Sequence, residues 1–405
     1  DHAPVMLQGH MDMVCEKRAG VEHDFEKDGL DLIIRDGRLT ANGTTLGGDN
    51  GVAVALMLMV LDDDEIEHPP VECVFTTEEE VGLNGAKALD KSVLKARTMI
   101  NMDSEDEGVA TVSCAGGLRV QFTKEIKRTT VQGSLLTLKV EGLLGGHSGQ
   151  DIDKERQNAD LLMARMIQRL LKETKGQLVS FNGGTKDNAI PRECEASLIY
   201  ESDEEAAKAE ELACELAETY AEELTPAEPD FSCEISCETN RTAEAIPQDA
   251  AKEFICAMRL APNGIQKRNI KMDGFVVVSL NLGVVRTEED RIVMIFSPRS
   301  SVASLQEDTK ERLNTLAETF GFTVSHSSEY PGWSFKEDSP VREICKESYK
   351  ELFGEDLKIE AIHAGLECGL FSDAIKGLDA IAIGPTIANC HTPDEYLTLD
   401  SFERF

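Results

Sequence analysis

The chain has 405 residues, with 41 lysines and arginines against 75 aspartates and glutamates, so its formal net charge is −34 at pH 7. A protein this negative repels phosphate backbones and anionic lipid, which argues against nucleic acid and membrane surfaces as partners. No apolar run is long enough to span a bilayer. The 41% of hydrophobic residues suffices for the cores of two or three domains.

The cysteines indicate a reducing compartment. All 11 are scattered singly, and the closest pair, Cys233 and Cys237, has no second pair with which to form a zinc knuckle. An odd number without a disulfide framework is typical of free thiols, so we expect a cytoplasmic protein. The chain opens at Asp1 almost directly into a strand, and residues 399–405 resemble the start of a helix. We therefore expect both ends to be truncated.

The first stretch of interest is a short apolar strand that stops at Gly9 and is followed by His10 and Asp12. In extended chain, positions i and i+2 point to the same side. A carboxylate beside a histidine is a common way of fixing the tautomer of a metal-binding imidazole.

Strands and helices then alternate. We expect a polar surface excursion at 16–37, a tight glycine-rich loop at 39–51, a buried helix at 51–61, and strands at 71–75 and 96–102. This alternation predicts a largely parallel sheet, in which ligands collect beyond the carboxyl ends of strands. His10, the run Glu78–Glu80 and Asp103 all follow strand ends.

The middle of the chain has a different order. The elements helix, strand, strand, helix and strand occur twice, at about 134–240 and 245–330. The α/β pattern resumes near Pro331. We therefore predict an α/β catalytic domain with a mixed, largely parallel sheet, formed by residues 1–114 and 332–405. An α+β lid domain of two similar halves, residues 115–331, is inserted into it. The helices expected after residue 134 are 155–172, 203–224, 247–260, 301–320 and 340–353.

Five side chains are candidates for a metal centre: His10, Asp49, one glutamate of the run 78–80, Asp103 and His391. Imidazole with carboxylate suits zinc, manganese or cobalt. Three carboxylates and two histidines are too many for one tetrahedral ion but suffice for two ions roughly 3.5–4 Å apart if one carboxylate bridges them. Asp49 is the natural bridge, because the glycines around it let the backbone come close. A spare glutamate would be the general base.

An ordinary surface role is the alternative for each of these residues. Most carboxylates of an acidic chain lie on its surface, and a run of three glutamates is usually solvated. The pattern of residues does not choose between Glu78, Glu79 and Glu80. What favours a metal centre is the repeated context of strand end, glycine-rich turn and histidine or carboxylate.

Several motifs, in this order and at this spacing, resemble the metal-site motifs of the M20 family of metallopeptidases. They are GHMD (9–12), GGDNG (47–51), TEEEVG (77–82), NMDSE (101–105) and NCHTPDE (389–395). The insert carries GGHSG (145–149), NAIPRE (188–193) and SPRSS (297–301), which are also similar to family motifs. HAGLECG (363–369) resembles the cytosolic Xaa-His, or aminoacyl-histidine, dipeptidases of that family. The fold implied is that of a zinc peptidase.

The resemblance implies a role for each residue of the catalytic domain. His10 and Asp103 would bind one zinc, Glu80 and His391 the other, and Asp49 would bridge them. Glu79 would be the general base, and Asp12 would orient His10. Asp103 is an aspartate where some carboxypeptidases and aminoacylases of the family have glutamate, which favours an aminopeptidase-like dipeptidase.

For the lid, the resemblance implies substrate contacts. His147 would donate a hydrogen bond to the oxyanion of the intermediate, Asn188 would be a second polar contact, and Arg299 would bind the free carboxylate of the dipeptide. Gly365, in the catalytic domain, would let the backbone approach the substrate. Turn residues and a surface salt bridge are the ordinary alternatives.

The sequence thus predicts a two-zinc dipeptidase acting on Xaa-His, carnosine-like and other unblocked dipeptides, with manganese or cobalt as substitutes for zinc. The first alternative is an amidohydrolase of the same family that removes acyl groups from N-acyl amino acids. The second is a metal-binding protein without catalysis, against which the intact Glu79 argues. The preferred dipeptide, the native metal and the choice between monomer and homodimer stay open.

Overall fold

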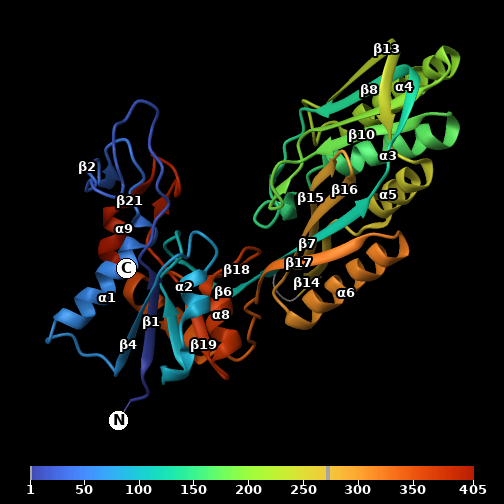
Figure 1. Ribbon diagram of the computed structural model, residues 1–405. Helices are drawn as coiled ribbons and strands as arrows, with labels where there is room; N and C mark the ends of the chain where they lie inside the picture. The colour runs from blue at the N-terminus through green and yellow to red at the C-terminus, as the bar shows by residue number, and fades with distance from the viewer. Residues whose placement is uncertain (1, 271–273) are drawn as a thin grey trace. The chain divides into compact units, whose positions relative to one another are not determined.

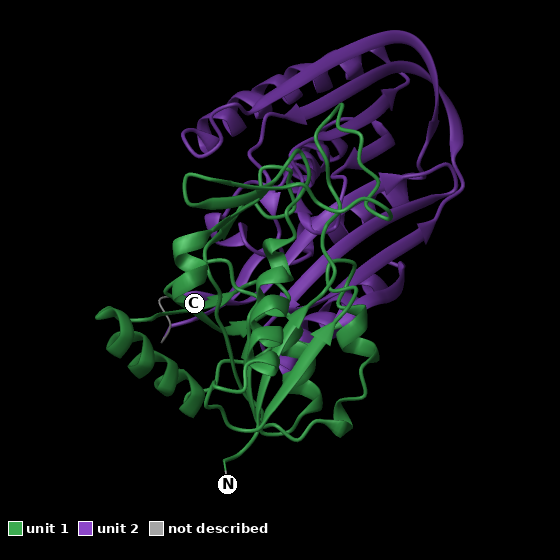
Figure 2. Ribbon diagram, turned by 90° about the vertical axis from the view of Figure 1, so that its left-hand side faces the viewer, with its two compact units in different colours: residues 1–115, 330–405 green, residues 116–329 purple. Residues whose placement is uncertain are grey.

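The computed structural model describes residues 2–270 and 274–405. The chain divides into two compact units, the first formed by residues 1–115 and 330–405 and the second by residues 116–329 (Figure 2). The first unit is therefore built from both ends of the chain. The sequence placed the insert at 115–331.

The first unit is organised around a six-stranded sheet with the order β18-β6-β19-β5-β1-β4 (Figure 1). The pairs of β1 with β4 and β5, of β19 with β5, and of β18 with β6 are parallel, whereas β19 and β6 are antiparallel. The predicted mixed, largely parallel sheet is thereby confirmed. Its strands are β1 (Val5–His10), β4 (Val71–Thr76), β5 (Thr98–Asn101), β6 (Val109–Cys114), β18 (Lys358–Ile362) and β19 (Asp379–Ala382).

A second, four-stranded sheet in this unit has the order β2-β3-β21-β20. It corrects the prediction of an irregular excursion at 16–37 and of a loop from residue 39. Strand β2 is exposed along its whole length, so it shows none of the alternation between buried and exposed side chains that reveals a strand in sequence. The strands are β2 (Leu32–Arg35), β3 (Arg38–Ala41), β20 (Ile387–Ala388) and β21 (Tyr396–Thr398).

The helices of the first unit follow sequence signals at their ends. In α7, the Ser339 side chain accepts the amide of Arg342, Pro340 occupies the first turn, and Gly354 ends the helix at φ 74°. These three residues explain why the bounds agree with the prediction 340–353. The helices are α1 (Gly48–Asp62), α2 (Asn84–Ala88), α7 (Pro340–Phe353), α8 (Glu367–Ala374) and α9 (Leu399–Arg404), with a 3-10 turn at Lys91–Val93.

The second unit holds a nine-stranded sheet with the order β13-β8-β12-β10-β15-β16-β7-β17, in which β14 pairs with β15. The two predicted halves are joined where β10 pairs with β15 at Gly183 and Val285. The strands are β7 (Gly116–Glu125), β8 (Thr129–Glu141), β10 (Gln177–Gly183), β12 (Cys194–Tyr200), β13 (Ser232–Ala245), β14 (Gly264–Asn269), β15 (Phe275–Thr287), β16 (Arg291–Ser300) and β17 (Thr323–Tyr330).

Four helices pack against this sheet, and their apolar faces share one core with it (Figure 1). Large rings such as Phe122, Phe181 and Phe254 are fully buried there. The helices are α3 (Ala159–Glu173), α4 (Asp203–Leu224), α5 (Gln248–Leu260) and α6 (Ala303–Thr319). A small ribbon of β9 (Gly146–His147) and β11 (Ala189–Ile190) and a 3-10 turn at Ile152–Lys154 complete the unit.

Two further expectations concern the described residues. No helix among them combines the length and the apolar character needed to cross a membrane. All 11 cysteines lie in the described part of the chain, and each is a free thiol.

Candidate metal centre

Parallel strands place the predicted residues at one edge of the first unit's sheet. Strand β1 lies between β4 and β5, with His10 opposite Thr76 and Gln8 opposite Asn101. Because Thr76 and Asn101 are the last residues of their strands, the segments that follow them leave the sheet beside His10. This is the edge at which ligands of such sheets collect.

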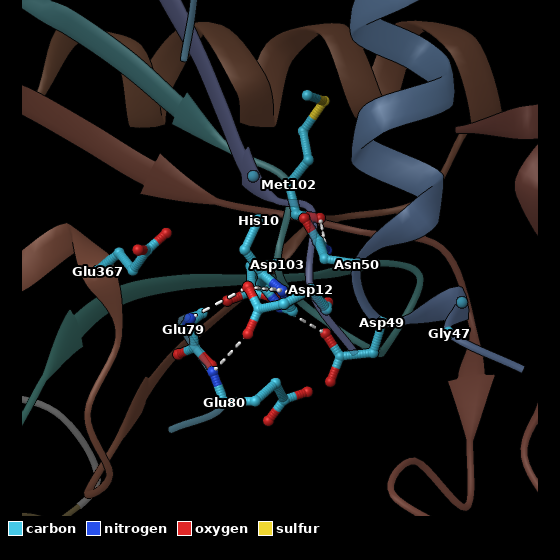
Figure 3. Close-up of polar contacts among 12 residues, drawn as sticks. His10, Asp12, Gly47, Asp49, Asn50, Glu79, Glu80, Met102, Asp103 and Glu367 are labelled. Carbon is cyan, nitrogen blue, oxygen red and sulfur yellow. Dashed lines mark hydrogen bonds and ion pairs between the residues drawn. The ribbon is translucent and has the colours of Figure 1, made fainter. Parts of the chain in front are cut away.

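Asp49 lies between the two histidines. Its Oδ1 is 3.0 Å from Nε2 of His10, and its Oδ2 is 3.3 Å from Nε2 of His391. Oδ1 of Asp103 lies 3.5 Å from the same nitrogen of His10, and Oε1 of Glu80 lies 3.0 Å from that of His391. Figure 3 shows the carboxylates of Asp49 and Glu80 on the side to which the His10 ring points.

The donor set suits metal ions. The structure brings His10, Asp49 and Asp103 into one group, and Asp49, Glu80 and His391 into another, with the donor atoms of each group within 4.8 Å of one another. Oxygen and imidazole donors in groups of three, with one carboxylate shared, match the needs of two neighbouring divalent cations. The same criterion also groups His10 with Glu79 and Glu80, and Asp49 with Glu105 and Cys390.

The carboxylates of the site favour the protonated, positively charged form of both histidines. Burial lowers the pKa of His10, but its hydrogen bonds to Asp103 and Asp49 outweigh burial and raise the pKa to about 12. Hydrogen bonds to Asp49 and Glu80 raise the pKa of His391 to about 10. Burial opposes ionisation of Asp49, yet its bonds to both histidines lower its pKa. The carboxylates thus stabilise the positive charge of the two protonated imidazoles. Bound cations would supply this positive charge in place of the two protons.

Asp12 touches His10 in a way that the sequence did not specify. Nδ1 of His10 lies 2.9 Å from the backbone oxygen of Asp12 and 3.6 Å from its carboxylate. A proton on Nδ1 that is donated to this carbonyl leaves Nε2 for a metal. Asp12 is in none of the four candidate metal groups that the described residues form.

Glu79 lies next to Glu80 and has a raised pKa. Burial, followed by the negative charges of Glu80, Glu367 and Asp49, raises its pKa to about 7, although the charge of His10 opposes this. A carboxyl group with a pKa near neutrality can both take up and release a proton at physiological pH.

Behind the site lies a polar network that sequence reasoning missed. Glu367 is fully buried, and its Oε2 accepts the Thr76 hydroxyl at 2.6 Å and the side-chain amide of Gln8. The Oε1 of Gln8 in turn accepts Nδ2 of Asn101 at 2.6 Å. The network joins the strands that lead to His10, Glu79 and Asp103. The pattern offered a weak signal, since each of the three polar residues Gln8, Thr76 and Asn101 directly follows an apolar residue near the end of its strand.

Three predicted residues lie together in the second unit. His147 pairs with Ala189, and the backbone oxygen of Asn188 accepts the amide of Ser148 at 2.8 Å. Burial and the charge of Arg299 lower the pKa of His147, so this imidazole is neutral at pH 7. Its Nδ1 accepts the amides of Gly149 and Gln150, which leaves the proton on Nε2.

Gly365 follows β18 in the first unit. A Cβ atom at this position would lie 2.8 Å from Cε2 of Tyr330, so the backbone and the ring approach more closely than a side chain permits. This contact is one structural reason for glycine here.

The chain matches the family model of peptidase family M20/M25/M40 over residues 6–405. Cytosol non-specific dipeptidase of Escherichia coli is 36% identical over 404 residues, which are 98% of this chain and 82% of that protein. Aminoacylhistidine dipeptidase from Vibrio alginolyticus is similar in structure, with a TM-score of 0.92 and 36% identity, and the match covers 99% of this chain and 83% of that one.

Aminopeptidase PepT from Bacillus cereus shares the fold, with a TM-score of 0.51 at 16% identity over 99% of this chain and 78% of that one. The resemblance seen in the motifs is thereby confirmed. The chain belongs to peptidase family M20/M25/M40, a family of metallopeptidases.

Proposed function

We propose that the protein is a two-zinc dipeptidase of the cytoplasm that hydrolyses Xaa-His and other unblocked dipeptides. Both relatives that match almost the whole chain at 36% identity are named as dipeptidases, one of the cytosol and one of aminoacylhistidine substrates. The free thiols of all 11 cysteines agree with a reducing compartment.

One observation carries the number of metal ions. Asp49 directs one carboxylate oxygen to His10 and the other to His391, at 3.0 and 3.3 Å. A carboxylate with each oxygen beside a different imidazole could bridge two cations, which supports the proposal of two. His10 and Asp103 would complete one set of ligands, and Glu80 and His391 the other.

When bound, a pair of divalent cations supplies an activated water and polarises the substrate carbonyl. The protein then has to move one proton. Glu79 would take it from the water and pass it to the leaving amine as the peptide bond breaks. A carboxylate beside the ions can serve both transfers, because it accepts a proton from the water and then holds it within reach of the leaving amine.

The second unit would supply contacts to the substrate. The neutral His147 can donate Nε2–H to the carbonyl oxygen as negative charge develops on it. Asn188 would add a second polar contact, and the guanidinium of Arg299 matches the planar carboxylate at the end of a dipeptide. Gly365 would let the backbone of the first unit approach the substrate.

Substitution of Glu79 tests the mechanism. Glu79→Ala should lower kcat by about 10²–10⁴-fold while metal content stays near two ions per chain. Glu78→Ala is the matched control, because Glu78 is exposed and its carboxylate accepts the side-chain amide of Asn84. Near-normal hydrolysis by Glu79→Ala would refute the assigned base.

A substrate panel tests the reaction. Carnosine and other Xaa-His dipeptides should be cleaved, and tripeptides and N-acetyl amino acids should not. Preference for N-acetyl amino acids would indicate a deacylase instead. A metal-loaded protein that cleaves nothing in the panel would indicate a binding protein.

A further inference from the structure

Glu395 holds the loop that carries Asp49. Its side chain is almost completely buried, with 3% of the residue exposed. Oε2 accepts the backbone amides of Leu46 and Gly47 at 2.8 and 3.1 Å. Oε1 accepts those of Gly48 and Asp49 at 2.8 and 3.4 Å. One carboxylate therefore binds four successive amides of a segment about 350 residues away in sequence.

These four amides have no hydrogen-bond acceptor within helix α1 and none on a capping side chain next to it. They lie at the start of α1, where the first N–H groups of a helix lack acceptors within it. Gly47, the residue before the helix, has a left-handed backbone at φ 69°, and it has no side chain that could cap the helix. Asp49 is itself non-helical, with φ −84° and ψ 101°. The carboxylate of Glu395 takes the place of the missing cap and stabilises an irregular turn.

A second contact fixes the other side of Asp49. The side-chain amide of Asn50 donates to the backbone oxygen of Met102 at 2.7 Å, just before Asp103 (Figure 3). The backbone of Asp49 is therefore held between Glu395 on one side and the segment of Asp103 on the other. The direction of the Asp49 carboxylate, with one oxygen toward each histidine, depends on this backbone.

Glu395 also belongs to the segment of His391. Its own amide donates to the backbone oxygen of Thr392 at 3.1 Å, which closes a turn right after that histidine. The same short segment thus supplies a candidate ligand and grips the candidate bridge. A shift of this segment would move both together.

We propose that Glu395 is a positioning residue of the metal centre, which sets the backbone of Asp49 so that its two oxygens reach two cations. The proposal rests on the proposed function, in which Asp49 bridges the ions. Glu395 touches neither substrate nor metal and acts through Asp49.

Glu395→Gln is the sharpest test, because it keeps the size of the side chain. Its NH₂ group must face two of the four amides, so donors would meet donors and the turn would move. We expect zinc and cobalt affinity, measured by chelator competition, to fall about 10–100-fold. The visible spectrum of the cobalt-loaded protein should change, and kcat at saturating metal should fall at least about tenfold.

Asp394→Asn is the matched control. Asp394 is the neighbouring acidic residue, but its side chain is 68% exposed and pairs with the exposed Arg18. This variant should keep the affinity and the cobalt spectrum of the wild type. Far-UV circular dichroism of the metal-free proteins checks that all variants fold. If Glu395→Gln does not fold, Glu395→Asp, whose shorter side chain reaches fewer amides, serves in its place.

The outcomes separate this proposal from the proposed function. A folded Glu395→Gln with wild-type metal affinity and cobalt spectrum would overturn the positioning role, even if its melting temperature fell. A wild-type protein that binds fewer than two ions, or cleaves no dipeptide, would overturn the proposed function instead. Both proposals are supported if the wild type binds two ions and cleaves dipeptides, and if Glu395→Gln binds the metal more weakly.

Discussion

The carboxylate of Asp12 accepts the backbone amide of Glu79 at 3.1 Å, and its second oxygen accepts that of Glu80 at 3.2 Å (Figure 3). The backbone oxygen of the same residue lies 2.9 Å from Nδ1 of His10. One residue thus joins the end of β1 to the loop that follows β4. The separation of the imidazole from the candidate base is fixed by Asp12.

Asp12→Ala should therefore impair catalysis more than metal binding. The backbone oxygen that holds His10 remains, whereas the loop of Glu79 and Glu80 loses its acceptor. We expect kcat to fall about 10–100-fold and the affinity for zinc to fall by less, since Glu80 is only one of several ligands. Asp12→Asn keeps one acceptor oxygen, so its kcat should lie between those of the wild type and of Asp12→Ala. Zinc loss in proportion to activity would show that Asp12 acts on the ligands themselves.

Glu367→Ala should destabilise the first unit. It removes the nearer acceptor of the Thr76 hydroxyl and of the Gln8 side-chain amide. The hydroxyl keeps only the backbone oxygen of Gly9 and the amide only Oγ1 of Thr76, each at 3.3 Å. A buried polar group that loses its good partner costs about 1–3 kcal/mol. The melting temperature of the metal-free protein should fall clearly. Glu367→Gln keeps a carbonyl oxygen for both donors and should melt close to the wild type. Equal melting of all three proteins would show that the network adds no stability.

Zinc uptake should release protons. Without metal, the pKa of His10 is raised to about 12 and that of His391 to about 10, so both imidazoles are protonated at pH 8. A metal binds neutral imidazole, so loading at pH 8 should release about two protons or more per chain. Calorimetry in buffers of different ionisation enthalpy measures this number. Release near zero would contradict the assignment of both histidines as ligands.

His147→Ala separates a catalytic role of the second unit from a structural one. The substitution lies outside the first unit and removes the Nε2–H donor. We expect kcat to fall about 10²–10³-fold, in the range of other oxyanion donors, while zinc content and KM change little. Loss of zinc from this variant would indicate that the histidine serves the fold or the metal centre.

Asp160 should make the stability of the protein depend on pH. It is fully buried at the start of α3, and its Oδ1 lies so close to Gly183 that a Cβ there would be 1.6 Å away. Burial raises its pKa to about 8. Because the folded state then holds a proton that the unfolded chain releases near pH 4, the contribution of this group is complete below that pH. It is lost as pH rises toward 8.

The neutral variant Asp160→Asn should lack this dependence. For the wild type, the group contributes a loss of up to about 1.4 kcal/mol per pH unit between pH 4 and 8. Urea unfolding of both proteins at pH 5 and pH 8 gives the difference. Parallel losses in the two proteins would place the pH dependence elsewhere.

Much of the fold was within reach of the sequence, because local chemistry decides it. The bounds of α4 and α7 agree with the prediction, since caps and apolar periodicity act over a few residues. The exposed strand β2 has no such pattern, and it was missed. In its sheet, residues 38–40 pair with residues 396–398, a contact that no local rule contains.

For the site, the sequence determined that His10, Asp103 and the glutamate run follow strand ends, and the parallel order of strands brings such ends together. It could not choose among Glu78, Glu79 and Glu80 without the family resemblance. Only the tertiary structure decided which atoms meet. The two oxygens of Asp49 reach two histidines, and Glu395 grips four amides about 350 residues away. Distances and directions between side chains remote in sequence are set by the packing of the strands, which a linear pattern does not encode.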